Sequence, residues 1–137
     1  MAYRPTNARQ VHLETVDEVV EAVGLQDVVS APAASLSHGR SRRLEIAIAL
    51  ASRPRLLLLD EPLSGMGVDD IAGMESLLRA LVPQHTVVLV EHNMPVTLAI
   101  ADRVSVLVAG AVLTEGSPSE VAADERVRDA YLGRGFL

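Results

Sequence analysis

Two adjacent carboxylates follow a short apolar run near the middle of the chain. The run Leu56–Leu59 consists of four leucines, and Asp60 and Glu61 come directly after it. A short, continuous apolar run predicts a buried strand, and open α/β sheets bind ligands at the carboxyl ends of their strands. In phosphoryl transfer the first acid of such a pair holds Mg²⁺, and the second orients the attacking water. The simpler interpretation is that both acids are solvated.

A second apolar run, over residues 86–90, ends in a comparable way at Glu91 and His92. A parallel neighbouring strand would place His92 at the same sheet edge as Glu61, near a terminal phosphate. A histidine at a strand end is more often an ordinary surface residue. Two such strand ends in one chain favour a phosphate site.

The third candidate lies directly before a predicted helix. It consists of Ser37, His38, Gly39 and Arg40. A serine and a glycine at the N-terminus of a helix present a hydroxyl and backbone N–H groups to an anion. Ser37 is equally well suited to be an ordinary N-cap. Taken alone, this motif favours the N-cap interpretation.

The elements that position these residues are predicted from apolar spacing and from turn residues. Helices are expected at about residues 16–23, 40–52, 71–81, 94–101 and 125–132, and a capping box is expected at 117–120. Two strands, at 55–60 and 86–90, are expected to be fully buried, and 104–115 reads as a hairpin. We expect Asp69 or Asp70 to cap the third helix. The second helix is expected to pack through Leu44, Ala47, Ile48 and Ala51.

The composition restricts the class of protein. The 137 residues carry a formal net charge of −6, with no cysteine, and every basic residue apart from histidine is arginine. This balance disfavours a nucleic-acid-binding surface, where a basic stripe is expected. No apolar run approaches the length that crosses a bilayer. We therefore expect a cytoplasmic chain that reaches a membrane only through a partner.

Together the motifs resemble, in order, those of ABC transporter ATPases. "LSHGRSRRLEIAIAL", "LLLLDEP", "LSGMG" and "VEH" resemble the signature motif, Walker B, D-loop and H-loop. The tail "GSPSEVAADERVRDAYLGRG" resembles the C-terminal extension of the subunits that drive branched-chain amino-acid import.

The resemblance implies an α/β fold, a partial P-loop NTPase fold. It would have parallel buried strands, flanking helices, a C-terminal hairpin and C-terminal helices. The expected single domain, 1–137, would hold the end of a helical subdomain and the signature helix at about 14–55. The sheet core and hairpin would follow at 56–116 and a helical extension at 117–137.

The resemblance also implies ATP and Mg²⁺ as cofactors and a role for each motif. Asp60 would order Mg²⁺, Glu61 would be the catalytic base, and His92 would contact the γ-phosphate. Ser64 and Gly65 would belong to a D-loop that connects two ATP sites. The signature residues (Ser37, His38, Gly39 and Arg40) would meet ATP held by a second ATPase subunit.

Three positions depart from the family pattern. His38 and Arg40 stand where the signature usually has Gly and Gln, and Gly67 replaces the usual D-loop Asp. A P-loop, Gly-x-x-x-x-Gly-Lys-Ser/Thr, is absent from the sequence, which has no lysine. The chain is therefore expected to be the C-terminal portion of such a subunit, inactive alone.

The expected partners are a second ATPase subunit and membrane permease subunits, the latter through the part not found here. Exposed strand edges and apolar surface also predict a homo-oligomer. Three alternatives remain: a non-catalytic interaction module, part of an ABC ATPase that acts outside transport, and an unrelated α/β domain in which the acids occur by chance.

Overall fold

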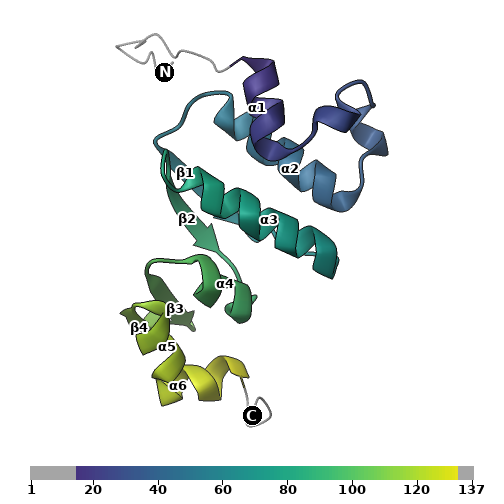
Figure 1. Cartoon of the computed structure of the whole chain (residues 1–137). Coiled ribbons are helices and arrows are strands. Elements are labelled where there is room, and N and C mark those ends of the chain that lie inside the picture. Colours follow the sequence, from purple (N-terminus) through teal and green to yellow (C-terminus); the bar gives the residue numbers. More distant parts are fainter. Residues whose placement is uncertain (1–14, 133–137) are drawn as a thin grey trace, which may run out of the picture. The chain divides into compact units, whose positions relative to one another are not determined.

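The computed structural model describes residues 15–132. The chain divides into two compact units, Met1–Leu89 and Val90–Leu137 (Figure 1). The described parts of these units contain helices and strands in the order that the sequence predicts, and the α/β class is confirmed. The expectation of one domain stays a prediction.

The first unit begins with helix α1, Val16–Val23, over the residues predicted from apolar spacing. Its N-terminus is a capping box in which the Thr15 hydroxyl accepts from the Glu18 N–H and the Glu18 carboxylate accepts from the Thr15 N–H. Gly24 ends the helix in the left-handed conformation, with φ of 68°. The helix contacts α2 through its buried face.

Helix α2, His38–Leu50, begins two residues before the predicted start and ends two residues before the predicted end. Its predicted packing stripe is wrong at one residue, because the Ile48 side chain is 68% exposed while Ile46 and Leu50 are buried. Ile46 and Ile48 lie about 200° apart around the helix. Both faces therefore carry a branched residue, and the sequence does not show which one is covered.

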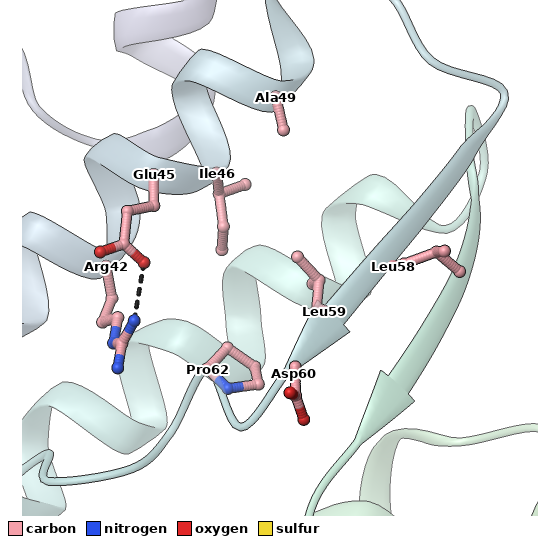
Figure 2. Close-up of a pocket in the computed structure, with 8 residues that line it drawn as sticks. All are labelled: Arg42, Glu45, Ile46, Ala49, Leu58, Leu59, Asp60 and Pro62. Atoms are coloured by element: carbon pink, nitrogen blue, oxygen red, sulfur yellow. Dashed lines mark hydrogen bonds and ion pairs between the residues drawn. The ribbon is translucent and has the colours of Figure 1, made fainter.

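Strand β1, Leu56–Asp60, and strand β2, Thr86–Val90, pair in a two-stranded sheet. They run parallel and are joined by helix α3, Val68–Leu81, as parallel neighbours require (Figures 1 and 2). The buried face of α3 consists of Met74, Leu77, Leu78 and Leu81.

The cap of α3 differs from the prediction. Gly67 occupies the N-cap position and makes no side-chain hydrogen bond, so the expected capping role of Asp69 or Asp70 is wrong. Both acids lie instead in the first turn. There they stabilise the helix through its dipole, because the N-terminal end carries partial positive charge.

Only one face of β1 is covered. The Leu57 side chain is 3% exposed, whereas Leu56 is 51% and Leu58 is 71% exposed. In β2, no residue reaches full burial, and Val88 is 47% exposed. The expected burial of both strands is therefore wrong for this chain. The physical reason is that successive side chains of a strand point to opposite faces, and the described helices cover one of them.

The second unit contains helix α4, Met94–Ile100, and the predicted hairpin, formed by β3, Val104–Val108, and β4, Ala111–Gly116. The strands are antiparallel, with Val108 opposite Ala111 and an irregularity in the register between Val106 and Leu107. Ala109 and Gly110 form the turn with φ of 50° and 79°. Two positive φ values fit the twist of a two-residue hairpin.

The hairpin is followed by helix α5, Pro118–Ala123, helix α6, Glu125–Val127, and a π-helical segment η3, Arg128–Leu132. The capping box predicted at Ser117 and Glu120 is confirmed. The core of this unit consists of Met94, Val104, Val106, Val121 and Val127. The predicted helix stop at Gly133 lies outside the described residues. Within residues 15–132, every helix is too short or too polar to cross a membrane.

Candidate nucleotide site

The two acids lie at the exposed carboxyl end of β1. Asp60 is the last residue of the strand, and Glu61 has a φ of 45°, in the left-handed region. The next two residues, Pro62 and Leu63, are buried, and the Ser64 N–H donates to the Glu61 carbonyl oxygen at 3.1 Å. A left-handed conformation at a residue other than glycine persists where the surroundings enforce it. The buried residues and this bond fix the turn that presents Glu61 to solvent.

A hollow of about 220 Å³, with a largely apolar lining, lies between α2 and the end of β1 (Figure 2). Its lining consists of Arg42, Glu45, Ile46, Ala49, Leu58, Leu59, Asp60 and Pro62. The Arg42 guanidinium pairs with the Glu45 carboxylate at 2.8 Å, as Figure 2 shows. Sites for small ligands span roughly 300–1,000 Å³. This hollow is therefore too small to enclose a nucleotide.

The signature residues occupy the N-terminus of α2. The Ser37 hydroxyl accepts from the Arg40 N–H at 3.4 Å, which confirms the N-cap interpretation. The Arg40 guanidinium pairs with the Asp27 carboxylate at 2.5 Å. Asp27 belongs to the short 3-10 helix η1, Gln26–Val28, so this pair connects η1 to the start of α2. The predicted contact of Ser37 and Arg40 with a phosphate stays a prediction.

Gly39 lies directly against the side chain of Asp70. A Cβ atom at this position would lie 2.7–2.9 Å from the carboxylate atoms of Asp70, which belongs to the first turn of α3. Real Cβ atoms essentially never show contacts below 3.0 Å. The missing Cβ of Gly39 therefore leaves room for the Asp70 carboxylate beside the start of α2, and a larger residue would make that side chain move.

His38 connects two of the predicted motifs. Its Nε2 lies 2.8 Å from the carbonyl oxygen of Ser64, in the loop between β1 and α3. Gly65 follows with φ of 73°, and a Cβ atom there would lie 3.1 Å from the same nitrogen. The structure thus brings His38, Ser64 and Gly65 together, as the separate motifs did not predict.

Arg43 is a structural residue of the site that the sequence did not indicate. Its guanidinium donates to the Val23 carbonyl oxygen at 2.9 Å, at the end of α1. It also lies against Gly24 and against Gly73 of α3, where a Cβ atom would collide with it. Arg43 therefore holds α2 against both neighbouring helices. The glycines at 24 and 73 were the only signal for this contact.

His92 belongs to the second unit, directly before α4. The Glu91 carboxylate accepts from the backbone N–H groups of His92 and Asn93, at 3.2 and 3.5 Å. The Asn93 side chain caps α4 by accepting from the Val96 N–H at 3.3 Å. These bonds define the backbone that carries the exposed His92. Its meeting with Glu61 stays a prediction.

The described residues could bind Mg²⁺ only together with a bound phosphate ligand. Among residues 15–132, no group of three or more histidine or acidic side chains lies close enough to hold a metal ion. Mg²⁺ is commonly bound by one or two carboxylates, with water and substrate phosphates completing its shell. Asp60 fits that pattern as a single carboxylate at an exposed strand end.

Two family models match the chain. The ABC transporter model matches residues 3–64, and the model of the branched-chain amino acid ATP-binding cassette transporter matches residues 111–136. The first match contains the signature helix and the two acids at the carboxyl end of β1. The second contains β4 and the helices that follow it.

Curated relatives and solved structures agree with these matches. The high-affinity branched-chain amino acid transport ATP-binding protein BraF of Pseudomonas aeruginosa is 37% identical over 116 residues, 83% of this chain and 46% of the relative. The lipopolysaccharide export system ATP-binding protein LptB of Acidithiobacillus ferridurans is 46% identical over 103 residues, 74% of this chain and 43% of the relative. A solved ATP-binding cassette of an ABC transporter superposes with a TM-score of 0.78, at 24% identity, over 96% of this chain and 53% of that chain.

The last similarity shows the fold alone. The chain spans about half the length of the curated relatives it matches. The motif order, the strand and helix arrangement, the two family models and the relatives all agree. This chain belongs to the ABC transporter ATP-binding family.

Proposed function

We propose that the chain forms the hydrolytic part of an ATP-binding subunit that powers the import of branched-chain amino acids. The observation that carries the proposal is the exposed end of β1. There Asp60 and Glu61 lie side by side in sequence, and Glu61 is held in a left-handed turn by buried neighbours. The substrate class rests on the family model that matches residues 111–136.

Each residue then has a chemical role in the proposal. Asp60 holds Mg²⁺ together with phosphate and water oxygens, and Glu61 orients and deprotonates the attacking water. His92 contacts the γ-phosphate. When bound, Mg²⁺ would neutralise the negative charge that develops on the phosphate oxygens.

The signature residues are proposed to act on a nucleotide held by a second subunit. Helix α2 has 13 residues and carries no acid in its first turn. The partial positive charge of such a helix start favours an anion. Ser37 and Gly39 would face that phosphate, and the loop with Ser64 and Gly65 would connect the two ATP sites. This arrangement requires a pair of ATPase subunits.

We further propose that the chain needs another polypeptide segment to bind ATP. The sequence holds no Gly-rich loop followed by lysine, and the hollow beside Asp60 is smaller than a nucleotide site. The segment that supplies these groups would also contact membrane permease subunits. The assembled subunit would lie at the cytoplasmic face of the membrane.

A chimera tests the hydrolytic role. The part of BraF that has no counterpart here is placed before this chain, and phosphate release from MgATP is measured. We expect hydrolysis by the chimera, none by the 137-residue chain alone, and a loss of about 10²–10⁴-fold in Glu61→Gln, the range for removal of a general base.

The matched control is Glu75→Gln. Glu75 lies on α3 and pairs with Arg79 at 3.0 Å, so its charge should not affect the chemical step. Hydrolysis that survives Glu61→Gln unchanged would refute the role of Glu61. An inactive chimera beside active BraF would refute the hydrolytic role of the whole chain.

A non-catalytic interaction module is the second candidate function. It is favoured by the apolar surface of β1, where Leu56 and Leu58 are 51% and 71% exposed. Such a module would bind another copy or an ATPase subunit without ever hydrolysing ATP. The inactive chimera described above is the result that would favour it.

A further inference from the structure

His38 stands where the family signature usually has glycine, and its imidazole makes a contact that a glycine could not make. The Nε2 atom lies 2.8 Å from the Ser64 carbonyl oxygen, between residues 26 positions apart in the chain. Ser64 belongs to the loop of residues 61–67, which joins β1 to α3. The contact therefore connects the first residue of α2 to the loop that carries Glu61.

The chemistry of this contact fixes the position of one proton. A carbonyl oxygen only accepts, so Nε2 must carry the hydrogen. Neutral imidazole meets this condition in one of its two tautomers, and imidazolium meets it in every case. The bond is therefore compatible with both charge states, and His38 in its neutral form is held as the Nε2–H tautomer.

The bond joins a loop that is ordered at its first half to the start of α2. Pro62 and Leu63 are buried, and the Ser64 N–H and the Met66 N–H donate to the Glu61 and Leu63 carbonyl oxygens at 3.1 and 3.2 Å. These two hydrogen bonds lie within the loop, whereas the His38 bond reaches from the loop to another element. Gly65 permits the contact, because its φ of 73° favours glycine and its missing Cβ leaves room for the imidazole.

We propose that His38 is a positioning residue that fastens the 61–67 loop to the start of α2, so that the two segments keep one geometry. The bond itself does not depend on the proposed function. Its consequence for catalysis does: a fastened loop holds Glu61 in one orientation relative to Ser37 and Gly39. In this chain the signature residue at position 38 thus acts on the loop of its own subunit.

The first test is the tautomer of His38 in the full chain, from long-range ¹H–¹⁵N correlations of ¹⁵N-labelled histidine. His85 is the matched internal control, because its Nδ1, rather than its Nε2, lies 2.6 Å from a carbonyl oxygen, that of Pro54. We expect the Nε2–H tautomer for neutral His38 and the Nδ1–H tautomer for His85. An Nδ1–H tautomer at His38 would overturn the proposal.

The second test is amide hydrogen exchange at Ser64 and Met66. In His38→Phe, which keeps an aromatic ring but removes the donor, exchange at both amides should rise about 2- to 13-fold, the range that corresponds to the loss of one hydrogen bond. His38→Gln retains an N–H donor of similar reach and should restore slow exchange. The amide of Gln84, which donates to the Leu81 carbonyl at 3.1 Å, should not change.

Equal exchange in wild type and His38→Phe would overturn the proposal. If His38→Phe unfolds, exchange at Gln84 rises as well, and the tautomer measurement on the wild type then decides. Failure of the ATPase chimera would leave both measurements unchanged, so the two proposals fail separately.

Discussion

We predict that the chain self-associates through the exposed face of β1, and the strength of this association can be estimated from the structure. The sheet has two strands, so each strand has one edge unpaired among the described residues. Unpaired edges beside apolar side chains favour pairing with another chain. Leu58 is the most exposed leucine of β1, at 71%, and points away from the side of the strand that carries Leu59 (Figure 2). We therefore choose Leu58→Glu as the perturbation.

The magnitude follows from the area that association would cover. Full burial of a leucine side chain contributes about 1.5–3 kcal/mol, so covering 71% of Leu58 contributes about 1–2 kcal/mol. In a symmetric dimer the same residue changes in both copies, which gives about 2–4 kcal/mol. The dissociation constant of the dimer should therefore rise about 30- to 900-fold.

The assay is sedimentation equilibrium over a range of concentrations, with circular dichroism as a check of folding. Ile48→Glu is the matched control, because Ile48 is 68% exposed but lies on a helix rather than beside an unpaired strand edge. A monomeric wild type at all concentrations would refute the reasoning. Equal weakening by both substitutions would also refute it, since the strand would then have no special part in association.

Two further predictions concern stability. Met74→Ala should lower the free energy of unfolding by about 2–5 kcal/mol, because Met74 is fully buried, while Val68→Ala, at a residue 85% exposed, should change it by less than about 0.5 kcal/mol. Urea titration measures both, and equal effects would contradict the assigned core. The second unit should lose stability in acid. The Arg126 side chain beside Asp124 and the Ser117 side chain beside Glu120 hold the pKa values of these carboxyls below their usual range. Their stabilisation is present above the unfolded pKa values, about 4, and is lost as the pH falls through the lower folded values. The urea concentration at which the hairpin signals report half unfolding should therefore decrease as the pH is lowered below about 4. A urea midpoint that does not change with pH in this range would contradict the prediction.

Local signals in the sequence were sufficient to predict much of the fold. Gly24, the capping box at Ser117 and Glu120 and the turn at Gly110 are each determined by residues within four positions of one another. Such signals do not depend on the rest of the chain, which explains why they were confirmed.

Contacts between distant residues could not be predicted. Two contacts depend on how α2 is rotated between its neighbours. They are the His38–Ser64 hydrogen bond and the packing of the Arg43 guanidinium against Gly24 and Gly73. The error at Ile48 has the same origin. Periodicity shows that a helix is apolar on a face, but it does not choose between two faces that both carry branched residues. The site acids were predicted as a pair, but the left-handed turn at Glu61 was not.

The exposure of β1 leads to the last step of the argument. Four successive leucines form the sequence of a strand whose two faces are both meant to be buried, as in parallel sheets covered by helices on each side. The described residues cover Leu57 and leave Leu58 exposed. The apolar sequence of β1 thus predicts a covering layer on both faces of the strand, whereas the described residues cover one face. We expect another polypeptide segment, or another copy of this chain, to supply that layer, and Leu58→Glu should weaken the contact in either case.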